Sequence, residues 1–100
     1  MMKVSMPVEA GNEAARKGKL GETVASILAD LKPEAAYFTE FDGRRTGLIF
    51  LDISDASQIP MIAEPWFLSL NASVEIRPVM TPDDLKKAGS YIEKAVKKYG

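Results

Sequence analysis

Few residues of this 100-residue chain can do chemistry, because it contains no histidine and no cysteine. That composition removes the commonest general base, the commonest metal ligand and all thiolate or disulfide chemistry. The strongest remaining pair is Asp52 and Arg77. Asp52 stands beside apolar neighbours, where a carboxylate can accept a proton, and Arg77 can orient an anionic or phenolic ligand. The simpler interpretation places both in a polar rim with Glu75, Lys3 and Ser5.

Trp66, the only tryptophan, has two interpretations. It can be a core anchor, since large aromatic side chains dominate the energetics of cores. It can instead form the wall of a pocket between its helix and the sheet. Ligand pockets are mostly apolar, with a few polar groups that orient the ligand. The residues that would line this pocket are Trp66, Tyr37, Phe50, Asn71 and Arg77, with Asp52 as the candidate catalytic group.

Arg44 and Arg45 follow the dipeptide Asp42-Gly43 and are expected at the tip of a hairpin. A solvated, charged tip explains them, and the nearby Glu40 and Asp42 weaken the alternative of an anion site. Alanine at both arginines is therefore expected to change the free energy of unfolding by no more than about 0.5 kcal/mol.

Four segments have the composition and alternation of strands. The first alternates apolar and polar side chains from Met2 and ends near Pro7. Pro78 cannot donate to a ladder, so it places the last strand at an edge or marks a bulge. The strands are expected at residues 2–8, 35–41, 46–53 and 73–80.

Three segments have the apolar spacing of helices. Asn12 is a plausible N-cap of the first, and Lys32-Pro33 ends it. Pro65 does not suit a helix interior, so a kink or a restart is expected there, with a stop at Asn71. Thr81 followed by proline and two aspartates is the clearest helix start. The helices are expected at residues 13–31, 59–70 and 82–99.

The order of these elements predicts a single α+β domain over residues 1–100. Two right-handed crossovers joined by a hairpin give a ferredoxin-like βαββαβ sandwich, here with an extra C-terminal helix. Both crossover helices are expected on one face of a four-stranded antiparallel sheet, with the first and third strands at its centre.

The third strand is apolar on both faces, which a lone sandwich does not explain. Leu48 and Phe50 lie on one face, while Ile49 and Leu51 lie on the other. An apolar patch of roughly several hundred Å² is more than a monomer normally exposes. The C-terminal helix, a second copy of the sheet, or both would cover it, and we predict a homodimer formed through this sheet face.

In element order and length, the whole chain resembles the dimeric α/β-barrel superfamily. There, two ferredoxin-like sheets pack face to face and a ligand cavity can lie between sheet and helices. The group includes cofactor-independent monooxygenases of antibiotic biosynthesis, muconolactone isomerases, haem-degrading enzymes and many small proteins without known activity. The monooxygenases are similar in placing a tryptophan, an asparagine and other polar groups around an aromatic substrate, which implies a site at Trp66. Similar haem-degrading barrels use an axial histidine, which this chain lacks, so we expect no cofactor.

Charge and hydropathy exclude other partners. The net charge of −1 and pI of about 5.4 disfavour nucleic acid. RNA-recognition motifs also carry aromatic stacking residues on the third strand, where this chain has Thr46 and Leu48. No apolar run approaches a membrane span or the core of a signal peptide, so we expect a cytoplasmic protein with no membrane partner. Asp83 and Asp84 are interpreted as helix-cap residues and not as a metal pair.

Two functions remain open on the sequence alone. One is a small dimeric protein that binds a small aromatic or anionic ligand or acts as a cofactor-free enzyme. The other is a non-catalytic structural or interaction dimer with a filled core. A cavity of about 300 Å³ or more beside Trp66 would favour the first, and a solid core there would favour the second.

Overall fold

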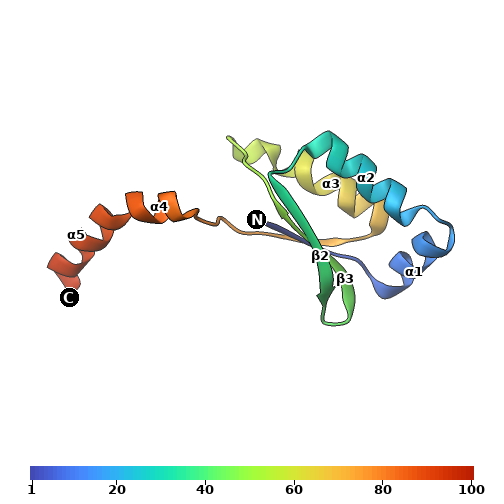
Figure 1. The fold of residues 1–100 in the computed structure, drawn as a ribbon, viewed down its shortest axis with the longest axis horizontal. Coiled ribbons are helices and arrows are strands. Elements are labelled where there is room, and N and C mark those ends of the chain that lie inside the picture. The colour runs from blue at the N-terminus through green and yellow to red at the C-terminus, as the bar shows by residue number, and fades with distance from the viewer.

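The computed structural model describes all residues, 1–100, as an α+β fold with a four-stranded antiparallel sheet and five α-helices (Figure 1). The strand order β2-β3-β1-β4 and the antiparallel pairing of all neighbours are compatible with a ferredoxin-like fold. The strands are β1 (Met2–Ser5), β2 (Ala35–Phe41), β3 (Arg44–Phe50) and β4 (Ser73–Ile76). The helices are α1 (Val8–Arg16), α2 (Leu20–Leu31), α3 (Ile59–Leu70), α4 (Pro82–Lys87) and α5 (Gly89–Tyr99), with a 3₁₀ turn, η1 (Ala56–Gln58).

The hairpin between β2 and β3 forms as expected. Asp42 and Gly43 have φ angles of 53° and 76°, so both turn positions need the left-handed region that glycine and aspartate tolerate. The strand bounds differ from the prediction, because β3 begins at Arg44 and its ladder ends at Phe50. The apolar residues that follow leave the sheet and line its end.

The first predicted helix is two helices, and Asn12 is not its cap. Asn12 lies inside α1, which starts directly after Pro7. The break falls at Gly18, whose φ of 69° ends α1 in the left-handed conformation typical of helix C-termini. The apolar spacing of α2 was predicted correctly. Gly18, which was expected inside one long helix, instead ends α1.

Helix α3 continues through Pro65, so the predicted restart does not occur. The stop at Asn71 is confirmed: its φ is 50°, and its backbone N–H donates to the Phe67 carbonyl at 3.1 Å. Apolar side chains occur all round this helix. Its inner side is buried, while Met61 and Leu68 on the other side are exposed.

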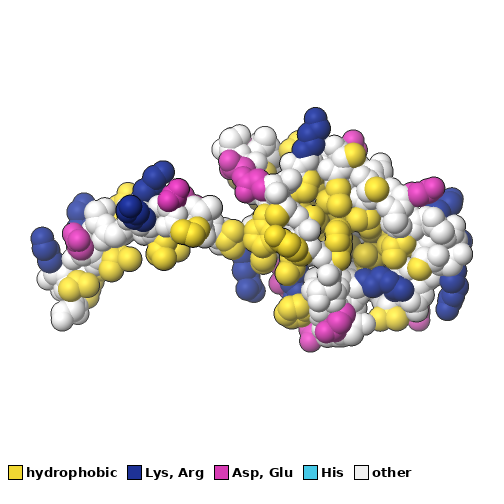
Figure 2. Space-filling view, in the orientation of Figure 1, with side chains coloured by type: hydrophobic (Ala, Val, Ile, Leu, Met, Phe, Trp, Pro, Cys, Tyr) yellow, Lys and Arg dark blue, Asp and Glu magenta, His cyan; other side chains and the backbone are white.

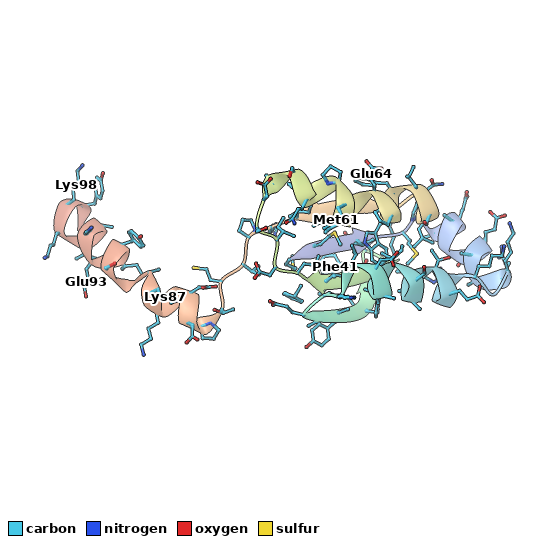
Figure 3. The ribbon with its side chains drawn as sticks, turned by 90° about the horizontal axis from the view of Figure 1, so that it is seen from above. Phe41, Met61, Glu64, Lys87, Glu93 and Lys98 are labelled. Atoms are coloured by element: carbon cyan, nitrogen blue, oxygen red, sulfur yellow. The ribbon has the colours of Figure 1, made fainter.

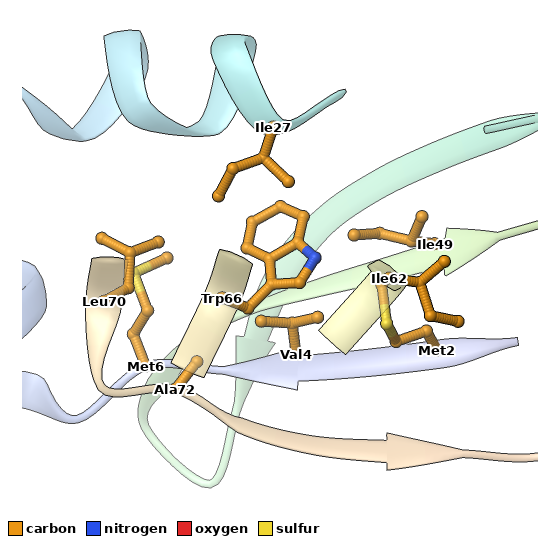
Figure 4. Packing of buried hydrophobic residues seen from close by; sticks show 9 residues of the cluster. All are labelled: Met2, Val4, Met6, Ile27, Ile49, Ile62, Trp66, Leu70 and Ala72. Atoms are coloured by element: carbon orange, nitrogen blue, oxygen red, sulfur yellow. The ribbon is translucent and has the colours of Figure 1, made fainter. Parts of the chain in front are cut away.

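One core lies between the helices and the face of the sheet that they cover, called here the inner face (Figure 4). β1 supplies Met2 and Val4 to it, and β3 supplies Ile49. This core is small, since 13 of 100 residues are buried. The chain therefore leaves much of its apolar surface uncovered. The core cluster consists of Met2, Val4, Met6, Ile27, Ile49, Ile62, Trp66, Leu70 and Ala72.

The opposite face of the sheet, the outer face, is apolar around β2 and β3, as predicted. The register pairs Tyr37 with Leu48, so both side chains lie on the face opposite to Ile49. Tyr37 is 63% exposed and Phe41 48%, and no helix of the chain covers them. The outer apolar patch consists of Tyr37, Phe41, Leu48 and Phe50.

Residues 78–100, called here the C-terminal arm, extend away from the rest of the molecule (Figure 1). β4 ends at Ile76 and not at Met80 as predicted, and the chain continues through Pro78 to the cap at Thr81. The extents of the molecule, 59 × 27 × 20 Å, reflect this projection. From above, Lys87, Glu93 and Lys98 lie far from body residues such as Phe41 (Figure 3). The last helix thus does not pack on its own subunit.

The two arginines of the hairpin have different surroundings. Arg45 Nη1 donates to Asn12 Oδ1 at 2.9 Å, which ties the hairpin to α1, while the Arg44 side chain has no hydrogen bond in the structure. We predict that Arg45→Ala lowers the free energy of unfolding by about 1 kcal/mol more than Arg44→Ala. Chemical denaturation of the two matched variants measures the difference. Equal values would show that the contact adds nothing to stability.

The cap of α4 predicts a pH dependence. The backbone N–H of Thr81 donates to Asp84 Oδ2 at 3.0 Å, and this bond, more than the one with the Thr81 hydroxyl, lowers the pKa of Asp84 below 3.8. Since the folded pKa is the lower one, the cap stabilises the arm above pH 3.8 and is lost as the pH falls through the lowered value. Circular dichroism should show acid loss of helix in the native chain that Asp84→Asn flattens. The control is Asp83→Asn, because the Asp83 side chain makes no hydrogen bond, and this variant should keep the pH profile of the native chain. Identical pH profiles for the two variants would contradict the role of the cap.

Candidate functional site

Trp66 lies in the core and not on a pocket wall. Its side chain is 1% exposed and packs among Val4, Ile27 and Ile62 (Figure 4). It lines none of the three main depressions of the surface. Its Nε1 is buried without a hydrogen-bond partner and points toward Ile49 and Ile62. The structure therefore places Trp66 as a core anchor and not in the lining of these depressions.

Tyr37 and Phe50 lie together, but on the other side of the sheet. Their ring centroids are 6.2 Å apart in an edge-to-face arrangement, which is a geometry that pairs of aromatic rings prefer. They belong to the outer apolar patch, whereas Trp66 packs on the inner face. The single pocket expected to join these three side chains is not formed, because the sheet separates them.

Asn71 is also apart from the other candidates. It occupies the left-handed position at the end of α3 and its side chain makes no hydrogen bond. A short polar side chain tolerates this conformation better than most residues. Its local role is to end the helix before β4.

Asp52 and Arg77 line the same depression at the end of the sheet, although they form no ion pair with each other. There the start of β1, the segment after β3, the start of α3 and the segment after β4 enclose a groove of about 460 Å³, called here the rim groove. Nine of its 14 lining residues are hydrophobic. The apolar lining is supplied chiefly by Met2, Leu51, Ile53, Ile59, Ile62, Ile76 and Val79.

The loop on one side of the rim groove is held rigid by its own hydrogen bonds. Ser57 N–H donates to Asp55 Oδ1 at 2.8 Å, and Ser54 N–H donates to Gln58 Oε1 at 2.9 Å. The hydrogen bonds from the Ser57 hydroxyl and backbone lower the pKa of Asp55. Asp55 is thus a capping carboxylate, which leaves Asp52 and Arg77 as the groove's free charged side chains.

A second depression, of about 510 Å³, adjoins the first and shares Asp52 and Leu51 with it. Its wall includes Phe50 from the outer apolar patch and Met80 from the C-terminal arm. The rim groove, the outer face and the start of the arm therefore form one continuous surface.

The polar rim expected on the outer face is present, but its charged side chains form no ion pairs with one another. The register makes Lys3 and Glu75 cross-strand neighbours, and Ser5 lies on the same face. Lys3 Nζ, however, lies 3.7 Å from the centroid of the Phe41 ring, a cation–π contact. The one ion pair of the structure joins Lys17 and Glu13 on the surface of α1.

Sequence reasoning did not identify the apolar residues that form the rim groove. Leu51 and Ile53 were assigned to the third strand, and Val79 to the fourth. A signal was available, since each apolar run extends past the point where its strand pairing can continue. Apolar residues beyond a strand end must be covered by another part of the fold, by a ligand or by a partner.

No group of three or more acidic residues lies where it could hold a metal ion, and no helix is long and apolar enough to cross a membrane. Comparisons of the chain with protein-family models, with curated proteins and with solved structures find no match.

The placement of Trp66 predicts a large cost of truncation. Trp66→Ala should lower the free energy of unfolding by about 3–5 kcal/mol, because it opens a cavity in the only core. Phe67→Ala is the matched control: this residue lies on the same helix, is 39% exposed, and its truncation should cost clearly less. Urea unfolding followed by circular dichroism compares them. Similar small losses in both would contradict the role of Trp66 as an anchor.

Proposed function

We propose that this chain binds a small, largely apolar carboxylic acid or phenol in the rim groove, as a homodimer of the ferredoxin-like, dimeric α/β-barrel kind. The carrying observation is the groove itself. Its volume of about 460 Å³ falls in the range of roughly 300–1,000 Å³ typical of small-molecule sites. No catalytic step is assigned, and the proposal needs no cofactor.

The charged groups at the groove favour an anionic or phenolic head on the ligand. The guanidinium of Arg77 offers several N–H donors in a planar fork suited to a carboxylate. Asp52 is exposed at the same groove and can accept a hydrogen bond from a protonated or hydroxylated ligand. An apolar body would then lie along the aliphatic lining while its polar head meets Arg77.

Homodimerisation is supported by the uncovered outer apolar patch. The accessible surface of the chain is 7367 Å², compared with about 5,600 Å² expected for a compact 10.9 kDa monomer. A second copy that faced this patch would bring two sheets together, as in the superfamily that the chain resembles. The compatible strand order supports the same assignment.

A second function, a non-catalytic interaction dimer, is favoured by the packing around Trp66. The side chain is 1% exposed and lines neither the rim groove nor the adjoining depression, and a core packed in this way is the feature expected of a structural module. In that case the rim groove would hold only water or a partner side chain.

Titration calorimetry with two probes of similar size distinguishes these functions. We predict that 2-naphthoate binds and that Arg77→Gln weakens it by about tenfold, the effect of losing a charged hydrogen bond. The neutral 2-naphthalenemethanol should be unaffected by this change. Ala56→Trp, which fills the groove, should weaken both probes.

Arg44→Gln removes the same charge away from the groove and serves as the control. Binding that survives Ala56→Trp would place the site elsewhere. If neither probe binds the native chain at millimolar concentration, the interaction dimer becomes the better account.

A further inference from the structure

The helices of the C-terminal arm carry an apolar stripe that nothing in the chain covers. Tyr99 is 80% exposed, Val96 60% and Ile92 53%. The space-filling view shows apolar side chains gathered along one edge of the arm and lysines along the other (Figure 2). This pattern is typical of a helix that packs one face against a surface. The exposed members of the stripe are Leu85, Tyr91, Ile92, Val96 and Tyr99.

The arm helices are too short to be stable without such a surface. α4 has 6 residues and α5 has 11, whereas isolated helices shorter than about 12–15 residues are marginal in water. The capping box at Thr81 supports the first turn, but none of the residues of either helix is buried. Packing against another molecule would supply the missing stabilisation.

The accessible surface that the chain exposes beyond that of a compact monomer is large enough for a stable interface. The chain exposes 7367 Å², about 1,800 Å² more than a compact chain of its mass. A standard interface buries about 800 Å² per partner, and obligate dimers bury more. The radius of gyration, 17.3 Å, is also well above the roughly 13 Å expected for 100 compact residues.

The position of the arm selects a second copy as the partner. The depression that Phe50 shares with Met80 joins the outer apolar patch to the start of the arm. A body seated on the outer face therefore lies within reach of the arm as well. The molecule is 59 Å long but 27 Å across, so the arm projects by about the width of a second body. Two-fold pairing makes such an exchange reciprocal, since each copy offers both an arm and a receiving face.

We propose that the C-terminal arms are exchanged: residues 78–100 of each chain pack their apolar stripe against the body of a second copy, beside its outer apolar patch. The lysines on the opposite edge of the arm then remain in water. This exchange does not depend on a ligand in the rim groove. Arm exchange also differs from a dimer formed by the sheet faces alone. In the exchanged dimer, removal of the apolar stripe would separate the two chains, whereas a dimer held by the sheet faces would remain.

Sedimentation equilibrium of the full chain tests the role of the stripe. The variant Ile92→Ser with Val96→Ser removes two stripe residues, and Lys94→Ser with Lys97→Ser changes the opposite edge in the same way. The exchange predicts a native dimer at micromolar concentration. The first variant should raise its Kd by at least about a hundredfold, and the second should leave it nearly unchanged. A native monomer, or a dimer that keeps its Kd in the first variant, would overturn the proposal.

A spin label distinguishes exchange from packing on the same chain. Because the protein has no cysteine, Ser90→Cys can be spin-labelled at a single site. An excess of this labelled, unenriched variant is mixed with ¹⁵N-enriched chains that carry no cysteine, so that most ¹⁵N chains pair with a labelled one. Exchange predicts broadening of body resonances of the ¹⁵N chain around Tyr37 and Leu48. No broadening, or broadening confined to arm resonances, would exclude contact of the arm with the body of the second copy and overturn the proposal.

Discussion

The structure depends on one constraint: the central part of the sheet is apolar on both faces, and the chain has helices for only one of them. Ile49 is buried beneath α3, while Leu48 beside it in sequence faces the other way. Burial of apolar surface is the main favourable term in folding, and a core cluster of nine buried residues uses only part of what this sequence offers. The helices of the chain therefore leave the outer face uncovered.

This constraint also explains where the candidate site lies. The helices and the inner face pack around Trp66 at the centre of their shared core, and Trp66 lines neither the rim groove nor the adjoining depression. Open apolar volume is found at the end of the sheet, where the pairing of β3 stops and where Asp52 and Arg77 both line the rim groove. The rim groove adjoins the surface that a second copy would cover. Ligand binding and dimerisation are therefore neighbouring events in this account, although neither requires the other.

Much of the fold could be predicted from local signals with a direct physical cause. Asp42-Gly43 predicted the hairpin, Thr81 predicted the start of α4, and the alternation of Leu48 and Ile49 predicted a strand that is apolar on both faces. The helix predicted over residues 82–99 is interrupted at Ala88, where α4 ends and α5 begins. The errors occurred where tertiary packing overrides a local signal. Pro65 remained helical because α3 is held by its buried side, and Asn12 became an interior residue because α1 could begin directly after Pro7.

The candidate site was less predictable than the fold, since it depends on which residues a sheet separates. Alternation along β2 and β3 places Tyr37 and Phe50 on one face, but only the position of α3 shows that Trp66 is on the other. That Asp52 and Arg77 line one groove depends on where two strands end, and strand ends are set by pairing partners distant in sequence. The departure of the arm from the body had no local signal, because an amphipathic helix looks the same whichever molecule it packs on.

The central claim, that a second copy completes the fold, is tested most directly by thermal unfolding at different protein concentrations, followed by the fluorescence of the buried Trp66. If folding and association are coupled, Tm rises steadily with concentration, because mass action stabilises the paired native state. A Tm that stays constant over roughly a hundredfold range of protein concentration would show that folding is not coupled to association. A single chain would then fold without a partner, which would contradict the account.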